Sequence, residues 1–191
     1  MVGPLKERTQ PVRVLEIGPG TGAVTRQIVQ LLRPDDRFDL VELNESFAAM
    51  LNRRFQVDPS YRPLARQSEI HVCPLQEFRT EVQYDYIISG LPLNNFSADM
   101  VREIFEIYFR LLAPQGVLSY FEYMYVRPVR KLMSGRKERA RLNALDEIMG
   151  SYLSQHHFHT GWVFVNLPPA WVQHLRRDAQ QDLSKLDQPK P

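Results

Sequence analysis

The chain has 191 residues, of which 43% are hydrophobic and 10% aromatic, so it can bury the core of one globular domain. Its 24 Lys and Arg residues nearly balance its 22 Asp and Glu residues, and a net charge of +2 argues against the broad basic surface of an RNA-binding enzyme. The single cysteine, Cys73, excludes an internal disulfide and a zinc site made of several cysteines, and we expect it to be a small buried residue on a strand.

Short apolar runs alternate with helix-period patterns, which is typical of a parallel sheet with helices on both faces. The predicted strands cover residues 12–17, 38–42, 70–73, 84–89 and 117–121. The predicted helices cover about residues 24–32, 44–55 and 101–112, and Asn44 is expected to cap the second of them.

The last third of the chain has a different character. Residues 127–141 hold seven basic side chains against one acid, a helix is predicted over about residues 140–155, and residues 157–166 have the pattern of a strand. The polar segment 182–191 ends in Pro-Lys-Pro and is expected to be a disordered tail. We therefore expect one domain over residues 1–181.

Three glycines, Gly18, Gly20 and Gly22, stand between the first predicted strand and the first helix. In this architecture the backbone comes close to a bound nucleotide there, and glycine removes the Cβ that would collide with it. The spacing alone is ambiguous, because it also fits a nicotinamide dinucleotide site, and Glu42 lies about 20 residues on, where a ribose-binding acid belongs in either case. A tight turn without a ligand is the third interpretation.

Three further features favour one of these interpretations. Together with the glycines, they make the sequence resemble the class I S-adenosylmethionine-dependent methyltransferases. An acid, Glu16, precedes the glycines in the order acid-x-Gly-x-Gly-x-Gly. Ser-Gly-Leu-Pro at 89–92 follows the fourth strand, where N-methyltransferases carry a polar-x-Pro segment, and Leu-Leu-Ala-Pro-Gln-Gly-Val-Leu at 111–118 resembles the usual approach to the fifth strand. A dehydrogenase would also need a second nucleotide-binding half or a catalytic domain, for which little chain remains.

The resemblance implies an α/β fold, a Rossmann-like three-layer αβα sandwich whose mostly parallel central sheet has an antiparallel C-terminal strand. It implies S-adenosylmethionine as cofactor and S-adenosylhomocysteine as product. The residues expected to bind the cofactor are Glu16, Gly18, Pro19, Gly20, Thr21, Gly22, Glu42, Leu43, Leu75, Gln76 and Ser89. One departure is that Cys-Pro-Leu ends the third strand, where many relatives place an aspartate beside the adenine.

The acceptor is indicated by residues 89–96 and 159–170, which are similar to segments of the bacterial phospholipid N-methyltransferases that convert phosphatidylethanolamine to phosphatidylcholine. Ribosomal RNA adenine dimethylases share the glycine loop, but they carry a helical RNA-binding domain after the catalytic one, and no such domain is expected here. Methylation of a small soluble amine, and a domain that binds cofactor or lipid without turnover, are further alternatives.

Methyl transfer aligns a lone pair with the methyl group and needs no covalent nucleophile. The residues expected to act at the reacting centre are Gly90 and Leu91, whose carbonyl groups orient the amine, and Glu122 and Tyr123, which balance or contact its charge. The residues expected to contact the substrate are Leu93, Phe96, Tyr120, Tyr125, Arg127 and Arg130. No metal site is predicted, because His157 and His159 lack a third ligand.

The expected partner is a phospholipid surface, and no nucleic-acid partner is expected. Basic residues interleaved with apolar ones in 127–141 suit an anionic membrane, although a solvated loop has the same composition. No stretch approaches the roughly 18 apolar residues of a membrane span, and the first residues lack the apolar core of a signal peptide. We expect a cytoplasmic protein bound peripherally to the inner membrane face, with a monomer slightly favoured.

Overall fold

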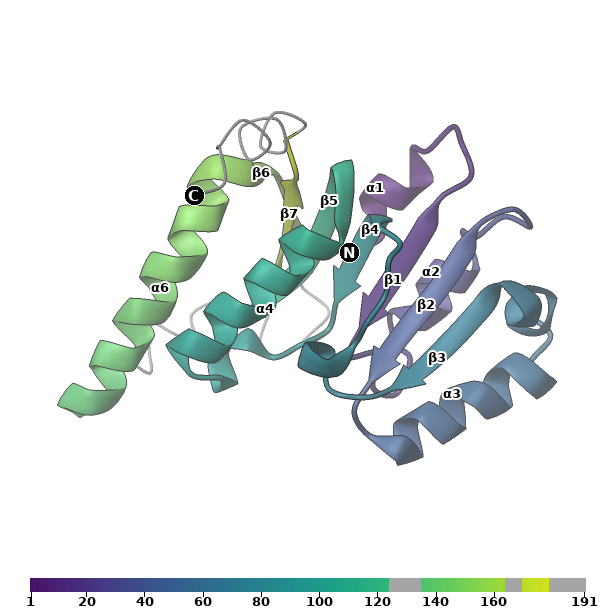
Figure 1. Cartoon of the computed structure of the whole chain (residues 1–191), viewed down its shortest axis with the longest axis horizontal. Helices are drawn as coiled ribbons and strands as arrows, with labels where there is room; N and C mark the ends of the chain where they lie inside the picture. Colours follow the sequence, from purple (N-terminus) through teal and green to yellow (C-terminus); the bar gives the residue numbers. More distant parts are fainter. Residues whose placement is uncertain (124–134, 164–169, 179–191) are drawn as a thin grey trace, which may run out of the picture.

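The structure, a computed structural model, describes residues 1–123, 135–163 and 170–178 (Figure 1). Seven strands within these ranges form one sheet in the order β3-β2-β1-β4-β5-β7-β6. They are β1 (Arg13–Ile17), β2 (Arg37–Glu42), β3 (Ser68–Val72), β4 (Tyr84–Ser89), β5 (Leu112–Tyr123), β6 (His157–Val163) and β7 (Ala170–Arg176). Strands β1 to β5 pair in parallel, and β7 is antiparallel to both of its neighbours, β5 and β6. The predicted mostly parallel sheet with one antiparallel C-terminal strand is therefore confirmed.

Helices cover both faces of the sheet (Figure 1). One face carries α1 (Gly3–Lys6), α2 (Thr25–Val29), α3 (Glu45–Val57) and the 3-10 turn η1 (Arg62–Gln67), and the other carries η2 (Leu75–Glu77), α4 (Ala98–Leu111) and α6 (Arg136–His156). Successive strand residues alternate between two cores, so that Val14 packs on the first side and Leu15 on the second. This alternation gives the predicted three-layer αβα sandwich.

Helices α3 and α4 each begin at a side chain that caps the first turn. The Asn44 side chain accepts hydrogen bonds from the backbone amides of Ser46 and Phe47, which confirms the predicted cap of α3. The Ser97 side chain accepts from the amide of Met100 and begins α4 in the same way. Within the described ranges, no helix is both long and apolar enough to span a bilayer.

Several predicted boundaries were wrong. Helix α2 ends at Val29 and not near residue 32, and α6 begins at Arg136 and not near residue 140, because the Arg, Lys and Glu residues after Gly135 favour a helix. Strand β5 begins at Leu112 and runs through the expected turn, where Gln115 has a φ of 64°.

The antiparallel C-terminal strand is β7, and its position in the chain was not predicted. Its Gln173 and His174 are buried, so the sequence lacks the apolar pattern of a covered strand. Strand β6 ends at Val163, and residues 164–166 of the predicted strand, like the predicted tail 182–191, lie outside the described residues.

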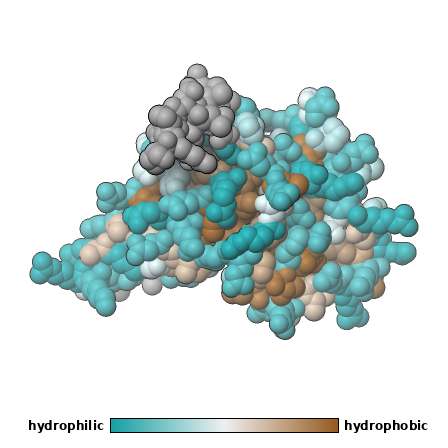
Figure 2. Space-filling view, in the orientation of Figure 1, coloured by the Kyte–Doolittle hydropathy of each residue, from teal (hydrophilic) through white to brown (hydrophobic). Residues whose placement is uncertain are grey.

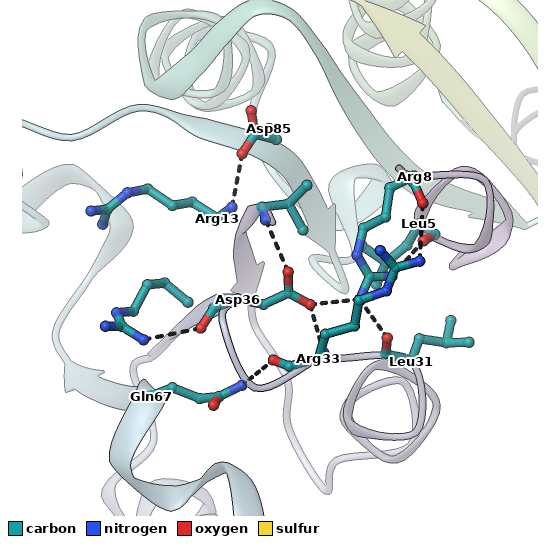
Figure 3. Close-up of polar contacts among 10 residues, drawn as sticks. Leu5, Arg8, Arg13, Leu31, Arg33, Asp36, Gln67 and Asp85 are labelled. Carbon is teal, nitrogen blue, oxygen red and sulfur yellow. Dashed lines mark hydrogen bonds and ion pairs between the residues drawn. The ribbon is translucent and has the colours of Figure 1, made fainter. Parts of the chain in front are cut away.

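A buried ion pair holds the N-terminal segment to the turn between α2 and β2 (Figure 3). Asp36 is fully buried, and its carboxylate accepts hydrogen bonds from Arg8 Nη2 at 2.5 Å, the amide of Arg33 at 2.7 Å and the amide of Val12 at 2.9 Å. Arg8 also donates to the carbonyl oxygen of Leu31 at 2.6 Å. This network sets where β1 begins relative to β2.

We predict that Asp36→Ala lowers the free energy of unfolding by about 3–5 kcal/mol, because it leaves the Arg8 guanidinium buried without its counter-ion. Arg102→Ala is the control, since the Arg102–Asp99 pair lies on the exposed surface of α4 and should contribute less than about 1 kcal/mol. Urea unfolding of both variants measures the difference. Equal losses in the two variants would contradict the structural role given to Asp36.

Candidate active site

The carboxyl ends of β1, β2 and β4 meet around an apolar cavity of about 170 Å³. Seven of the residues predicted to form the site line it: Gly18, Glu42, Leu43, Leu75, Gln76, Leu91 and Phe96. Larger hollows of about 340 to 520 Å³ exist elsewhere on the described surface, but none of them is lined by the glycine loop. Ligands of open α/β sheets bind at the carboxyl ends of the strands, so we place the site at the smaller cavity.

The glycine loop, residues 18–22, has a conformation that requires glycine at its alternate positions. Gly18, Gly20 and Gly22 have φ angles of +66°, +54° and +80°, a region that side chains disfavour. An added Cβ at Gly18 would lie 2.8 Å from Leu91 Cδ2, and at Gly22 it would lie 2.7 Å from Arg54 Nη1. Nothing lies within 4 Å of the Cβ position at Gly20, so the backbone there is open to a ligand.

Glu42, at the end of β2, holds the glycine loop in place. One carboxylate oxygen accepts a hydrogen bond from the amide of Gly20 and the other accepts from the amide of Asn44, each at 2.8 Å. Arg54 on α3 donates from Nη1 to the carbonyl oxygen of Thr21 at 2.8 Å and fixes the loop from its other side. Each carboxylate oxygen of Glu42 keeps a lone pair for a ligand hydroxyl.

Glu16 is the second acid of the site and lies beneath the loop with 1% of its surface exposed. Its Oε2 has no hydrogen-bond partner among the described residues. Burial raises the pKa of Glu16 to about 8, against the opposing effect of the neighbouring Thr25, and the charge of Glu42 adds to the rise. A cationic ligand group near Glu16 would be attracted to its ionised form, so the two acids and the glycine cradle fit a positively charged nucleoside cofactor.

The post-β4 loop, residues 90–96, is in direct contact with the glycine loop. The amide of Gly90 donates to the carbonyl oxygen of Ile17 at 2.8 Å, and an added Cβ at Gly90 would lie 2.5 Å from the carbonyl oxygen of Gly18. The Ser89 hydroxyl accepts from the amide of Leu91 at 3.3 Å and lies 2.5 Å from the hydroxyl oxygen of Tyr108 on α4. The two loops therefore form one packed unit.

Three predicted contact residues have a different place in the structure. Ser89 is fully buried and its hydroxyl is bound to Tyr108, so it supports the post-β4 loop from below and does not face the cavity. Leu93 is 2% exposed within the apolar core. Tyr120 is fully buried and packs edge-on against Phe105, with ring centroids 5.5 Å apart. These side chains fill the core beneath the site, because their strand and loop positions point toward α4.

Of the remaining predicted residues, some are described by the structure and others lie outside its described part. Pro19, Gly20, Thr21 and Gly22 form the glycine loop, and Glu122 is buried at the end of β5, opposite Trp171 of β7. The backbone of Tyr123 belongs to β5, but its side chain lies outside the described part of the structure, as do Tyr125, Arg127 and Arg130.

Six residues that line the cavity were not among the predicted site residues: Ile17, Val41, Cys73, Pro74, Met100 and Ile104. Met100, on the first turn of α4, is 39% exposed, and its sulfur lies 2.9 Å from Gln76 Nε2. An apolar side chain beside the buried stripe of α4 is the signal that could have identified it. Cys73 is not a buried strand residue, because β3 ends at Val72 and Cys73 is half-buried at the cavity wall.

One cluster of possible metal ligands occurs in the described structure, away from this cavity. Ligand atoms of Asp39, Glu69 and His71 lie within 4.8 Å of one another. Asp39 is engaged by the protein itself, because one oxygen lies 3.1 Å from His71 Nε2 and the other accepts from the Tyr84 hydroxyl at 2.8 Å. We assign it no catalytic role.

A family of methyltransferase domains matches residues 15–118, which is more than half of the chain. The chain belongs to this family. The match begins within β1 and ends within β5, so it contains both the glycine loop and the post-β4 loop.

Two curated relatives are each 31% identical to the chain. An ornithine lipid N-methyltransferase of Singulisphaera acidiphila matches over 111 residues, which are 58% of this chain and 57% of that protein. A malonyl-[acyl-carrier protein] O-methyltransferase of Bacillus cereus matches over 122 residues, which are 61% of this chain and 40% of that protein. The chain thus spans less than two thirds of the length of these relatives.

Solved structures show the same fold. The N-methyltransferase NodS of Bradyrhizobium japonicum has a TM-score of 0.62 at 15% identity, covering 92% of this chain and 91% of its own. The O-methyltransferase TomG of Streptomyces achromogenes, solved with S-adenosylmethionine, has a TM-score of 0.64 at 17% identity, covering 86% and 73%. The family match and these structures confirm the predicted methyltransferase family and fold.

We predict that Glu16 makes the protein less stable as the pH rises. Its pKa is about 8 in the folded chain and ordinarily 4.5, so between these values the unfolded chain loses a proton that the folded chain retains. The contribution of Glu16 to the free energy of unfolding therefore falls as the pH rises from 4.5 to about 8, and it is constant at higher pH. Glu16→Gln should gain stability relative to wild type between pH 5 and pH 8, whereas the exposed Glu81→Gln should not. Urea unfolding measures the free energy of unfolding of each protein. If the difference between Glu16→Gln and wild type were the same at pH 5 and pH 8, Glu16 would not be a buried acid with a raised pKa.

Proposed function

We propose that the chain transfers a methyl group from S-adenosylmethionine to the amine nitrogen of a membrane lipid, with phosphatidylethanolamine as the preferred acceptor. The observation that carries this proposal is the 31% identity to an ornithine lipid N-methyltransferase. That match supports a lipid acceptor and transfer to nitrogen. The ethanolamine headgroup is favoured by the similarity of residues 89–96 and 159–170 to phospholipid N-methyltransferases.

The surface around the cavity supports a lipid acceptor. Four apolar side chains form an exposed apolar rim beside the strand ends: Leu43, Phe47, Val72 and Met100 are 68%, 37%, 49% and 39% exposed. An apolar area is visible over this end of the sheet, at the lower margin of the molecule in Figure 2. Exposed apolar groups of this kind are expected where a protein meets a membrane or an acyl chain. Positive charge that attracts anionic lipids is exposed on a separate part of the surface, at Arg136 and Lys137 at the start of α6.

The bound cofactor supplies a methyl group on a sulfonium, so an amine lone pair can form the new N–C bond while the C–S bond breaks and its electron pair stays on sulfur. The chain's own residues align the reactants. Glu42 keeps the glycine loop against the cofactor, and the packed contact between Gly18 and Gly90 sets the distance to the post-β4 loop. An alkyl amine with a pKa near 10 arrives protonated, so its proton must pass to a base before the nitrogen attacks. The Glu122 carboxylate, buried at the end of the neighbouring strand β5, is the group proposed to take this proton or to balance the charge of the ammonium.

The test is a methylation assay with labelled S-adenosylmethionine. Vesicles containing phosphatidylethanolamine, vesicles containing ornithine lipid, a water-soluble amine and malonyl-[acyl-carrier protein] serve as acceptors in parallel. We expect label in the amino lipids, most in phosphatidylethanolamine, and none with Gly18→Val, whose side chain would collide with Leu91. Label in the carrier-protein arm alone would refute the N-methyltransferase proposal in favour of O-methylation, for which the Bacillus cereus relative is the supporting observation.

We predict that Phe47→Ser combined with Val72→Ser weakens binding to phosphatidylethanolamine vesicles roughly tenfold, because two apolar side chains no longer enter the bilayer interface. Neither side chain lines the cavity, so S-adenosylhomocysteine affinity should stay unchanged. Val57→Ser is the matched control, since Val57 is 62% exposed at the opposite end of α3. Cosedimentation measures vesicle binding, and wild-type binding by the double variant would exclude the apolar rim as the contact surface.

A further inference from the structure

A second cavity, of about 340 Å³, lies at the amino ends of β1, β2 and β3, whereas the apolar cavity of the active site lies at the carboxyl ends. Arg13 and Arg37 begin β1 and β2. Arg66 lies on η1 just before β3, and Arg79 lies between η2 and β4. All four line this cavity, which we call the arginine pocket. Its volume falls within the range of about 300 to 1,000 Å³ that small-molecule sites occupy.

Two of these arginine side chains have no polar partner among the described residues. The carboxylate beside Arg13, that of Asp85, accepts a hydrogen bond from the backbone amide of Arg13 at 2.8 Å and not from its guanidinium. In Figure 3 the Arg13 side chain extends away from the buried Arg8–Asp36 pair, and no dashed line reaches its guanidinium. Arg66 is exposed and forms no side-chain hydrogen bond or ion pair within the described ranges.

The other two arginines bind backbone oxygens only. Arg37 Nη1 lies 3.3 Å from the carbonyl oxygen of Asp36. Arg79 Nη1 donates to the carbonyl oxygen of Gln76 at 2.5 Å and to that of Phe78 at 3.2 Å. A carbonyl oxygen carries no formal charge, so the positive charges of all four arginines remain without a carboxylate partner in the described structure.

Elsewhere in the described structure arginines do meet carboxylates. Arg8 pairs with Asp36 at 2.5 Å. Arg141, on α6, pairs with Glu138 at 2.7 Å and donates to the carbonyl oxygen of Phe96 in the post-β4 loop at 2.6 Å. A single exposed arginine without a carboxylate is ordinary because water solvates it, but four around one hollow repel one another where protein replaces part of that water. The missing counter-charge therefore points to an anionic ligand.

Two acids in the pocket wall do not supply this counter-charge. Asp39 is engaged by His71 Nε2 at 3.1 Å and by the Tyr84 hydroxyl at 2.8 Å. Glu69 has 74% of its side chain exposed and lies 3.9 Å from His71 Nδ1. Four arginines against these two acids leave the hollow positively charged, and a concave wall of one sign concentrates the field that attracts a counter-ion.

The chemistry of the guanidinium group favours phosphate among the anions. Its planar fork of N–H donors matches phosphate oxygens in a two-point geometry. A phosphate group presents several charged oxygens and can bind guanidinium groups from different directions, whereas a carboxylate has only two oxygens in one plane. Arginines on four separate segments suit the first kind of ligand, and the cavity has room for more than one phosphate group.

We propose that the arginine pocket binds a small soluble anion that carries phosphate groups. Such a ligand joins the segments that precede β1, β2, β3 and β4. Because only the folded chain brings the four arginines together, the ligand stabilises the native state by mass action. The inference does not depend on the proposed acceptor, since the arginine pocket and the active-site cavity share no lining residue.

The position of the pocket favours a soluble ligand over a lipid headgroup. Leu43 and Val72 of the exposed apolar rim lie at the carboxyl ends of β2 and β3, whereas Arg37 and Arg66 lie at the amino ends. The six residues of β2 extend over roughly 20 Å. A bilayer that contacts the rim is therefore at the far end of the strands, which leaves the pocket to ligands in solution.

Calorimetric titration with inorganic pyrophosphate tests the site at constant ionic strength. Arg13→Gln combined with Arg66→Gln should weaken pyrophosphate binding about tenfold or more, because two charge-assisted contacts are lost. Arg26→Gln combined with Arg53→Gln is the matched control, since it removes the same charge from the exposed surface of α2 and α3 and should change the affinity less than about twofold. S-adenosylhomocysteine should still raise the melting temperature of both double variants, which shows that they are folded.

Two results of this titration would overturn the proposal. One is the absence of pyrophosphate binding by wild type. The other is equal weakening in the two double variants, because that result indicates a general charge effect and no defined site.

Modification by phenylglyoxal, followed by mass spectrometry, locates the site in the wild-type chain and needs no variant. We expect pyrophosphate to slow the modification of Arg13 and Arg66 at least threefold and to leave Arg26 and Arg53 unchanged, because a bound anion covers only the guanidinium groups that contact it. Equal rates with and without pyrophosphate at Arg13 and Arg66 would contradict the assignment.

Cosedimentation with vesicles that contain phosphatidic acid separates the two sources of phosphate. If the ligand is soluble, the Arg13/Arg66 double variant and the Arg26/Arg53 control bind the vesicles equally well, and pyrophosphate does not displace wild type from them. Loss of vesicle binding in the Arg13/Arg66 variant alone would overturn the soluble assignment and identify a lipid phosphate as the ligand.

Discussion

The site depends above all on the carboxylate of Glu42, which joins three elements that are separate in the sequence. It binds the amides of Gly20 and Asn44, so the end of β2, the glycine loop and the start of α3 share one buried anchor. The loop has three positive φ angles and a large conformational entropy to lose, and its internal backbone bond runs from the amide of Gly22 to the carbonyl oxygen of Pro19 at 2.9 Å. The Glu42 carboxylate adds a hydrogen bond at the amide of Gly20 and ties the loop to the start of α3, while the Cβ position at Gly20 stays open to a ligand.

The second constraint is the direct packing of the glycine loop against the post-β4 loop. A hydrogen bond from Gly90 to Ile17 and the close approach to Gly18 leave no room for a side chain at either glycine. Tyr108 supports this pair of loops through Ser89. The two loops beside the cavity therefore form one packed unit, which suits the proposed methyl transfer, whose barrier depends on the alignment of two atoms.

The charges of the site match this chemistry. Burial keeps Glu16 neutral near pH 7 in the free protein, and a sulfonium nearby would favour its ionised form. No side chain has to form a covalent bond, so the polar groups serve to hold and orient. The exposed apolar rim around Leu43 is the part of the surface that supports the proposed lipid acceptor.

The sequence by itself determined the alternation of strands and helices, the Asn44 cap and the glycine loop with Glu16 and Glu42, because each of these depends on neighbouring residues or on a local pattern. Only the tertiary structure decided the rest. It placed Ser89, Leu93 and Tyr120 in the core, since strand and loop orientation is set by what packs above them. It inserted β7 between β5 and β6 and paired Arg141 with a loop more than forty residues away, because long-range contacts leave no periodic signal in the chain.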